Sequence, residues 1–453
     1  MDKIFLTKDI SHILDILNFY GRGYIIGGYI RDTLLGIHPK DCDFCTDISY
    51  KRLLSIFSGY SSVSVGKSFG VIKIHLNGLT YDIAKMRRDV SFTSNRRETG
   101  IEFVDNIMED LQRRDFTINS IAYDGRNFVY GSKLCEEDIN GKTVRFIGLP
   151  SDRIKEDPLR MLRGIRLFTE KNLKNFDYDS LNAIKINANL INNISMERIR
   201  EEFVKILLSD RPKLGIIYLL KCNLLQEFLP ELYDCYNFEQ HNPNHHKDVF
   251  GHSLLVLENT KKDIILRLAA LFHDIGKPNT FSMENGVGHF YGHNIISTEL
   301  THKILSRLNF SKYIIDAVSK LVYDHMSMIN VSTKSSAKKI INRVGIENIE
   351  NLYFLSRADI LGSFPPYNFD RIDAALNLIR GIIFANEPLS VKDLKISGKD
   401  IINLGITDGI LIGEILKICL AEVLENPDKN NKEILIHIAK CNMHNNKISE
   451  KNL

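Results

Sequence analysis

Two aspartates with a spacing of two, Asp41 and Asp43, follow closely on a pair of glycines, Gly27 and Gly28. On a β-strand, residues i and i+2 point to the same face, so the two carboxylates would lie side by side. Carboxylates arranged in this way can hold two divalent ions about 3.5–4 Å apart, as metal-dependent phosphoryl transfer requires. The glycines permit a sharp turn whose N–H groups can bind an anion. The segment therefore predicts a two-metal site for chemistry on a phosphate.

Arg31 and Asp82 are the side chains expected to complete this site. Arg31 lies just after the glycine pair, within reach of a phosphate. Asp82 lies in the second of two apolar runs, 71–76 and 79–84, which an Asn-Gly pair separates in the pattern of a β-hairpin. A neighbouring strand could thus supply the third carboxylate. The alternative is that the first two aspartates belong to a solvated loop, since a DxD pattern by itself is weakly specific.

The elements around these residues predict an α/β head followed by helices. Up to about residue 140 the sequence alternates between helical and strand patterns: a first helix, the glycine turn, the aspartate strand, a helix near residues 50–58 and the hairpin. Beyond it, apolar residues recur with helical spacing and strand patterns nearly vanish. We expect four parts, namely a head at 1–140, a helical neck at 141–235, a further helical domain at 236–380 and a helical tail at 381–453.

The composition favours a soluble, cytoplasmic protein, and its net charge leaves room for a local basic surface. The 453 residues are 44% apolar, and 59 basic against 56 acidic residues give a net charge of +3, which argues against a nonspecific coat for nucleic acid. The N-terminal segment lacks the apolar stretch of a signal peptide, and no later apolar run is long enough to cross a membrane. Seven scattered cysteines do not predict a disulfide framework, and the Cys42/Cys45 pair has no second pair for a zinc site.

Further motifs occur in order along the first half of the chain. After GGYIRD and KDCDF come EDLQRRDFTINS at 109–120, EDPLRMLR at 156–163 and SMERIREE at 195–202. This series resembles the class II tRNA nucleotidyltransferases, which include the CCA-adding enzymes and the bacterial poly(A) polymerases. The resemblance extends to about residue 210 and recurs near residues 396–400. It implies an α+β fold, in which a small, polymerase-β-like mixed α/β head precedes an elongated helical part.

The resemblance also implies an activity, extension of the 3′ end of tRNA with CTP and ATP. The primer 3′-hydroxyl would attack the α-phosphate and pyrophosphate would leave, with magnesium held by Asp41, Asp43 and Asp82. The motifs imply nucleotide-binding roles for Gly27, Gly28, Arg31, Asp110, Arg114, Asn119, Asp157, Arg160 and Arg163. For the segment around Asp115 the alternative is an ordinary helix start with turn and capping residues.

Asp157 and Arg160 are three residues apart, so on a helix they would project from one face. A carboxylate beside a guanidinium presents an acceptor next to a donor. Cytosine and adenine offer an amino donor beside a ring-nitrogen acceptor, whereas uracil and guanine present the reverse pattern and would leave buried groups unpaired at about 1–3 kcal/mol each. The pair could therefore read the base. Taken alone, it could equally be a surface ion pair worth about 0.2–0.5 kcal/mol.

The segment from Met86 to Arg97 resembles the flexible loop that this family associates with switching from C to A addition, although Lys85 and Met86 stand where the family usually has Thr and Phe. Because enzymes that add only CC lack this loop, its presence favours complete CCA addition. The alternatives within the family are a poly(A) polymerase and an enzyme that adds only CC or only A.

Histidines and aspartates in the second half form another ordered series, which resembles an HD-domain phosphohydrolase. Its core ligands would be His252, His273, Asp274 and Asp359, and a second metal or the substrate phosphate would involve His293 and His325. Imidazole and carboxylate ligands suit Mn, Ni, Fe or Mg better than a thiolate-preferring ion. Such a domain can also persist as a scaffold without hydrolytic activity.

The helical part would then consist of a neck, an HD domain and a tail. The tail contains the segment 394–405 and a following amphipathic helix, which the resemblance assigns to holding the outer arm of the tRNA. An alternative of a different class is an HD phosphodiesterase whose head only binds RNA. Intact metal-spaced carboxylates in the head argue against this alternative.

Overall fold

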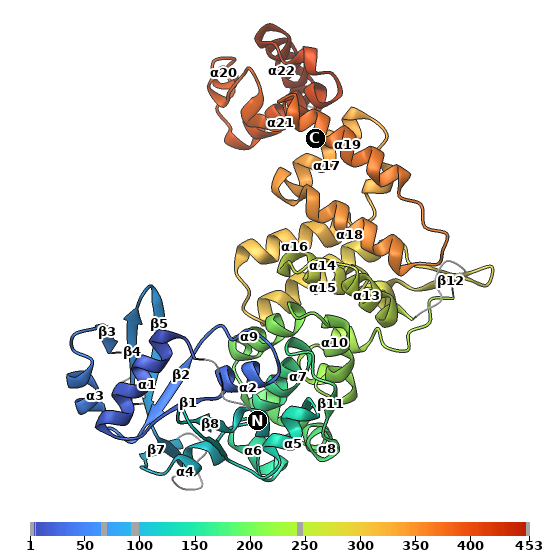
Figure 1. Cartoon of the computed structure of the whole chain (residues 1–453). Helices are drawn as coiled ribbons and strands as arrows, with labels where there is room; N and C mark the ends of the chain where they lie inside the picture. The colour runs from blue at the N-terminus through green and yellow to red at the C-terminus, as the bar shows by residue number, and fades with distance from the viewer. Residues whose placement is uncertain (1–3, 5, 65–69, 92–98, 242–247, 450–453) are drawn as a thin grey trace. The chain divides into compact units, whose positions relative to one another are not determined.

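The computed structural model describes residue 4 and residues 6–64, 70–91, 99–241 and 248–449 (Figure 1). The chain forms two compact units, Met1–Phe228 and Leu229–Leu453. Among the described residues, the first unit carries the main β-sheet and the second is almost entirely helical. A mixed α/β head followed by helices was predicted from the sequence, and the described elements have this arrangement.

A seven-stranded sheet forms the centre of the first unit. Its strand order is β3-β4-β5-β2-β1-β8-β9. β2 and β5 run parallel, and the other neighbouring pairs run antiparallel. The strands are β1 (Gly23–Ile26), β2 (Asp43–Thr46), β3 (Ser61–Ser64), β4 (Val71–Leu76), β5 (Leu79–Lys85), β8 (Ile121–Tyr123) and β9 (Phe128–Tyr130).

The hairpin predicted around Asn77 and Gly78 is present. β4 and β5 pair antiparallel up to Leu76 opposite Leu79, and the two turn residues have φ of 50° and 80°. Positive φ at both positions is what a two-residue type I′ turn requires. β5 also pairs with β2, so that Asp82 lies opposite the first residue of the aspartate strand. The turn therefore fixes the register of β5, which places Asp82 beside Asp43.

Helices pack on this sheet and continue beyond it. α1 contacts β1 and buries Ile10, Ile13, Leu14 and Leu17, whose spacing of three and four residues makes one apolar face. Thr7 caps the helix by accepting a hydrogen bond from the N–H at its third position. The helices of the unit are α1 (Lys8–Tyr20), α2 (Gly28–Leu34), α3 (Tyr50–Ile56), α4 (Ile107–Gln112), α5 (Cys135–Asn140), α6 (Pro150–Glu156), α7 (Arg160–Glu170), α8 (Tyr178–Ile186), α9 (Met196–Leu207), α10 (Pro212–Lys221) and α11 (Leu225–Phe228).

The glycine turn lies between β1 and α2. Gly27 has φ of 65° and ψ of −121°, a conformation open almost only to glycine, and α2 begins at Gly28. A Cβ atom on Gly27 would lie 2.9 Å from Nη1 of Arg114. The turn thus brings the backbone against a side chain of the EDLQRRDFTINS motif.

The segment predicted as a flexible loop, Met86 to Arg97, begins with the first strand of a two-stranded ribbon. β6 (Arg87–Ser91) pairs antiparallel with β7 (Thr99–Phe103), and residues 92–98 lie outside the described residues. Met86, just before the ribbon, is buried in an apolar cluster with Val104 and Leu111. A second short pair, β10 (Thr143–Val144) with β11 (Asn175–Phe176), runs parallel.

The second unit is built from helices that pack around two cores. α13, α14, α16 and α18 contact one another in its HD part, and α20, α21 and α22 enclose a separate apolar cluster around Ile401, Ile415 and Cys419. The helices are α12 (Pro230–Tyr233), α13 (Val249–Glu258), α14 (Ile264–Phe272), α15 (His293–Arg307), α16 (Lys312–Asp324), α17 (Lys334–Val344), α18 (Ile349–Gly362), α19 (Asp370–Phe384), α20 (Gly398–Ile402), α21 (Gly409–Glu425) and α22 (Lys432–Ser449). None of the described helices has the length and apolar character needed to cross a membrane.

One hairpin of this unit was not predicted. β12 (Ser282–Glu284) pairs antiparallel with β13 (Val287–His289), and the turn residues Asn285 and Gly286 have φ of 51° and 77°. The strands are too short for a recognisable alternation of polar and apolar residues. The Asn-Gly pair, however, is the same turn signal that identified the first hairpin.

Candidate active site and metal centre

The carboxylates of the head meet where β2 begins. Asp43 is the first residue of β2 and lies opposite Asp82 of β5 in parallel register. Loss of hydration and the negative charge of Asp82 raise the pKa of Asp43, and the positive charge of Arg114 opposes this shift. Asp82 in turn accepts a hydrogen bond from Lys73, with Nζ and Oδ2 2.9 Å apart. Two carboxylates therefore lie together with cations nearby.

Asp41 does not lie on the strand, contrary to the prediction. β2 begins at Asp43, and Asp41 precedes it by two residues in an exposed, irregular segment. Strand alternation therefore does not align the two side chains. Their charges still interact, because Asp41 contributes, after burial and Asp82, to the raised pKa of Asp43.

A cavity of about 300 Å³ next to Asp43 is rich in arginine. Six arginines reach it from α2, from the segment after α4 and from α7. Its lining residues are Gly27, Gly28, Arg31, Asp43, Arg113, Arg114, Asp115, Asn119, Arg160, Arg163 and Arg166. Guanidinium groups bind phosphate oxygens through paired hydrogen bonds, so this lining suits a polyphosphate.

Two hydrogen bonds orient the guanidinium of Arg31. It donates from Nε to Oδ1 of Asp32 at 2.7 Å and from Nη1 to Oδ1 of Asn119 at 2.7 Å. Asp32 also accepts a hydrogen bond from Lys171 at 2.9 Å. Because Lys171 directly follows α7, this contact ties the end of α7 to α2.

Asp110 holds two arginines at once. It accepts from Arg113 at 2.7 and 3.0 Å, from Arg114 at 3.1 Å and from the Arg87 backbone N–H at 3.2 Å. Burial alone would raise the pKa of Asp110, but the charges of Arg114 and Arg113 outweigh it and the pKa is lowered. Asp110 is buried and does not line the cavity. In this structure its contacts orient the two arginines, and the nucleotide-binding role that the resemblance implies for Asp110 stays a prediction.

The remaining arginines of the cavity have acidic partners of the same kind. The pairs are Arg160–Glu156 (2.6 Å), Arg163–Asp115 (2.7 Å) and Arg166–Glu202 (3.0 Å). Burial would raise the pKa of Asp115, but Arg163 and a hydrogen bond from Asn119 outweigh it and lower the pKa. Sequence reasoning missed Arg113, Asp115 and Arg166 as lining residues. The spacing of three from Arg160 to Arg166 along α7 was a signal for the last of these.

Asp157 and Arg160 do not share a helix face, contrary to the prediction. α6 ends at Glu156, Asp157 is extended with φ −146° and ψ 99°, and α7 begins at Arg160. Because Pro158 follows Asp157, the helical conformation is disfavoured there. Asp157 lies 3.2 Å from Nη2 of Arg198. Asp157 and Arg198 line a separate cavity, whereas Arg160 lines the arginine cavity.

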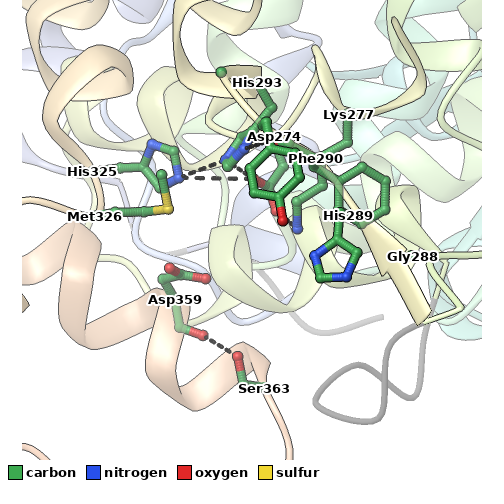
Figure 2. A pocket seen from close by; sticks show the side chains of 12 residues that line it. Asp274, Lys277, Gly288, His289, Phe290, His293, His325, Met326, Asp359 and Ser363 are labelled. Carbon is green, nitrogen blue, oxygen red and sulfur yellow. Dashed lines mark hydrogen bonds and ion pairs between the residues drawn. The ribbon is translucent and has the colours of Figure 1, made fainter. Parts of the chain in front are cut away.

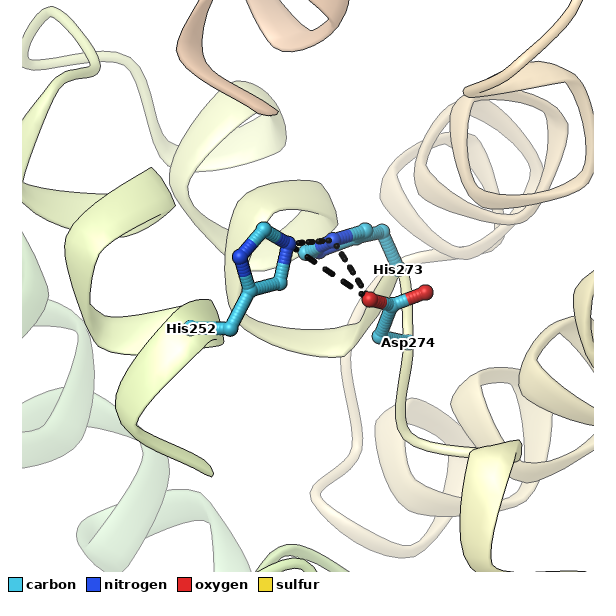
Figure 3. Close-up of side chains that lie close together, drawn as sticks. All are labelled: His252, His273 and Asp274. Carbon is cyan, nitrogen blue, oxygen red and sulfur yellow. Dashed lines mark hydrogen bonds and ion pairs between the residues drawn. The ribbon is translucent and has the colours of Figure 1, made fainter. Parts of the chain in front are cut away.

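The residues of the predicted HD site converge in the second unit. They come from five helices: His252 on α13, His273 and Asp274 at the end of α14, His293 at the start of α15, His325 at the end of α16 and Asp359 on α18. Figure 3 shows one group, in which Nε2 of His252 lies 3.2 Å from Nε2 of His273 and 3.5 Å from Oδ2 of Asp274. Nε2 of His252 is also 3.0 Å from Oδ1 of Asp359.

A second group shares Asp274 with the first. Oδ1 of Asp274 lies 3.3 Å from Nε2 of His293 and 3.7 Å from Nε2 of His325. The two Nε2 atoms are 3.4 Å apart. Asp274 therefore offers one oxygen to each histidine pair. Burial would raise the pKa of Asp274, but His273 and Lys277 hold it well below the usual range.

Each of the four imidazoles is oriented by a contact on its outer nitrogen. The Nδ1 atoms lie 2.7–3.2 Å from backbone carbonyl oxygens, those of Gly362, Ala270, Phe290 and Val322 for His252, His273, His293 and His325. A carbonyl can only accept, so Nδ1 donates its proton and the neutral ring turns the Nε2 lone pair toward the carboxylates. This tautomer is the one that a metal ligand needs.

The pKa values of two histidines are shifted in opposite directions within the centre. Burial and the neighbouring His273 lower the pKa of His325 to about 4, so this ring is neutral near pH 7. Burial would also lower the pKa of His273, but Asp274 and Asp359 outweigh it and raise the pKa. A cation bound between these groups would compete with the proton of His273.

Comparison with known proteins finds three family matches along the chain. Residues 23–145 match the family described as "Poly A polymerase head domain", residues 175–235 match "Probable RNA and SrmB- binding site of polymerase A", and residues 245–362 match "HD domain". A CCA-adding enzyme of Ligilactobacillus salivarius is 30% identical over 423 residues, which cover 92% of each chain. The chain belongs to the CCA-adding enzyme family, whose members are tRNA nucleotidyltransferases.

Another relative is named for a different activity, the addition of A. An A-adding tRNA nucleotidyltransferase of Deinococcus radiodurans is 28% identical and covers 88% of this chain and 90% of its own. Among solved structures, the Bacillus stearothermophilus CCA-adding enzyme in complex with CTP covers 99% of this chain and 100% of its own, with a TM-score of 0.72 and 21% identity. The Thermotoga maritima CCA-adding enzyme complexed with tRNA covers 96% of each, with a TM-score of 0.57 and 19% identity. These likenesses confirm the fold predicted from the sequence.

Asp110→Asn is predicted to weaken nucleotide binding without removing any group from the cavity lining. Arg113 and Arg114 would lose their shared anion, so the KM for CTP and ATP should rise about tenfold or more, because hydrogen bonds to charged groups contribute about 1.5–3 kcal/mol. The free energy of unfolding should fall by about 3 kcal/mol, as for a broken buried ion pair. Steady-state kinetics and urea unfolding measure the two effects.

Glu109→Gln is the matched control, since Glu109 pairs with Arg88 at the surface and has no contact with the cavity arginines. It should change stability by no more than about 1 kcal/mol. If Asp110→Asn loses stability as expected but keeps a normal KM, the orientation of Arg113 and Arg114 does not contribute to nucleotide binding.

Proposed function

We propose that this chain completes or repairs the 3′-terminal CCA of tRNA with CTP and ATP, releasing pyrophosphate. The observation that carries the proposal is the cavity lined by six arginines, which adjoins Asp43 next to the strand of Asp82. A nucleoside triphosphate needs positive groups along its phosphates and carboxylate-held metal ions at the reacting one. The relatives solved with CTP and with tRNA support the same substrates.

Magnesium fits the carboxylates of the head. Mg²⁺ prefers carboxylate oxygens and keeps several of its waters, so it needs an accessible site. Asp41 is exposed, Asp43 keeps part of its surface exposed although its carboxylate has lost hydration, and Asp82 is half-buried on the adjoining strand. These three residues would hold the metal, which when bound neutralises charge on the phosphate oxygens and favours the ionised 3′-hydroxyl.

The chain's own residues would bind and orient the nucleotide around this point. The backbone of Gly27 and Gly28 and the side chains of Arg31 and Arg114 adjoin Asp43 in the cavity and would contact the phosphates. Asn119 would steady Arg31 through their 2.7 Å hydrogen bond. The tail helices α20–α22 would hold the outer arm of the tRNA.

The end point of addition separates this proposal from its alternatives, poly(A) tailing and addition of CC or A alone. Purified protein is incubated with tRNA that lacks its last three nucleotides, with CTP and ATP offered separately and together, and the tRNA ends are sequenced. Three added nucleotides followed by a stop are expected. Addition of A only to tRNA already ending in CC would instead favour an activity like that of the Deinococcus relative.

Asp43→Ala and Asp82→Ala are each predicted to lower the rate of nucleotide addition by about a thousandfold or more, because several kilocalories of transition-state stabilisation would be lost. Binding of tRNA, measured by filter retention, should remain within about twofold. Asp15→Ala removes an exposed carboxylate from α1 and should leave the rate unchanged. Persisting activity in either variant would contradict the metal-binding role.

We also propose that Asp157 and Arg160 together read the base, which requires the two side chains to approach each other when the nucleotide binds, because they line separate cavities here. Each now has another partner, Arg198 for Asp157 and Glu156 for Arg160. The ion pair to Arg198 is half-exposed and contributes no more than about 1 kcal/mol, so a bound base could displace it at little cost. A base would then receive the acceptor and the donor that C and A require.

Asp157→Ala and Arg160→Ala are accordingly predicted to admit UTP and GTP, with misincorporation rising about tenfold relative to CTP. Competition between the four nucleotides on the same tRNA measures the selectivity. Asp152→Ala, which removes an exposed carboxylate of α6, serves as the control. Continued exclusion of U and G in both variants would remove the base-reading role.

The geometry of the HD centre favours a second activity, hydrolysis of a phosphoester with a divalent metal. Four imidazoles turn Nε2 toward Asp274, which gives an oxygen to each pair. Mn, Ni, Fe or Mg would suit this set of ligands. The bound metal would supply a polarised phosphate and a metal-bound hydroxide near neutral pH.

His273→Ala and Asp274→Ala are predicted to lose most of the metal that the wild-type protein retains after dialysis, measured by elemental analysis. Hydrolysis of bis-p-nitrophenyl phosphate with each metal should fall in parallel, while CCA addition should persist. The control is His302→Ala, an exposed histidine on the helix that carries His293. Unchanged metal content would show that the cluster is a hydrogen-bonded core.

A further inference from the structure

The cavity of the HD centre has an aromatic wall as well as a metal-binding one. Its volume is about 450 Å³, within the range of small-molecule sites. Four of its lining residues belong to the candidate metal centre, namely Asp274, His293, His325 and Asp359. The end of β13 and the segment after it line the same cavity with three consecutive aromatic side chains, His289, Phe290 and Tyr291. Figure 2 shows His289 and Phe290 beside the candidate metal ligands. The metal-binding role accounts for none of these three rings.

Two of the rings are stacked and open on one side. The planes of His289 and Tyr291 differ by only 6°, and their centroids lie 5.3 Å apart. Tyr291 is 67% exposed, although a tyrosine gains from burying its ring. A parallel pair whose outer ring faces solvent can add a third flat ring by the same offset stacking.

The chain fixes this pair close to the metal ligands. β13 ends at His289 and α15 begins at His293, so three residues connect the strand to a ligand of the centre. Phe290 anchors the connection, because its ring packs against Phe281 at 5.7 Å and lies 5.3 Å from Nζ of Lys277. With Phe290 anchored, the rings on either side of it remain available at the cavity.

We propose that His289 and Tyr291 form the base-binding part of the HD site, so that the site takes nucleoside phosphoesters in preference to phosphoesters without a base. The inference rests on the proposed phosphohydrolase function, because the phosphate would lie at the metal centre. A nucleoside monophosphate joins a phosphate to a flat ring through one sugar, which matches a cavity with a cation-binding wall and a stacking wall. A phosphoester without a ring would leave Tyr291 in water.

Adenosine 5′-monophosphate and ribose 5-phosphate test this preference, because they carry the same phosphoester with and without a base. The kcat/KM ratio of the two is measured with the metal-loaded, full-length protein. The wild-type ratio should favour the adenosine compound by about tenfold or more, as base stacking on an aromatic ring predicts. Tyr291→Leu should bring the ratio close to one, and Tyr291→Phe should preserve it. His302→Ala is the control for an exposed ring on the same unit.

An equal loss on both substrates in Tyr291→Leu would overturn the proposal, and so would a wild-type ratio near one. If neither compound is hydrolysed, the proposed phosphohydrolase function is wrong. Binding of the two compounds then tests the stacking site by itself. Calorimetry would then measure the affinity of the manganese-loaded protein for each compound. Tighter binding of the adenosine compound that Tyr291→Leu abolishes supports the stacking site, and equal binding by wild-type protein and Tyr291→Leu rejects it.

Discussion

The head depends on anions that hold cations in place. Six arginines converge on one cavity, and like charges at that density would repel one another and turn outward into water. A carboxylate next to each guanidinium prevents this, and Asp110 does so for Arg113 and Arg114 together. The carboxylates lie on helices and turns far apart in the sequence. The contacts of α2, α4, α7 and α9 therefore keep six positive charges directed at one cavity.

The HD centre also depends on side chains that are held in place by contacts on their outer side. Its histidines are oriented from outside the cluster by backbone carbonyls, three of which lie only three residues before the histidine that they contact. Ring orientation is therefore a local property for these three histidines, whereas His252 depends on the carbonyl of Gly362 on a distant helix. The tertiary fold brings the four rings together around Asp274. In both sites, contacts on one side of each side chain leave its other side directed at the cavity.

Local signals explain what could be predicted from the sequence. The Asn-Gly turn and alternating residues predicted the strand of Asp82, and the order of histidines predicted the side chains that converge around Asp274. The predicted helix face of Asp157 was wrong because Pro158 interrupts the helix, a signal that was present but not used. The role of Asp110 depends on contacts with arginines whose direction only the packed structure fixes. Its charge and spacing alone could not distinguish a nucleotide contact from a support.

The two-residue turn between β4 and β5 has a consequence for how this protein can vary. Successive side chains of a strand alternate between faces, so inserting one residue at Gly78 and re-pairing β5 would carry Asp82 to the other side of the sheet. Loop length is usually free to drift during evolution because loops lie outside the core. Here the chemistry of the head would set the length of a turn at the far end of the strand.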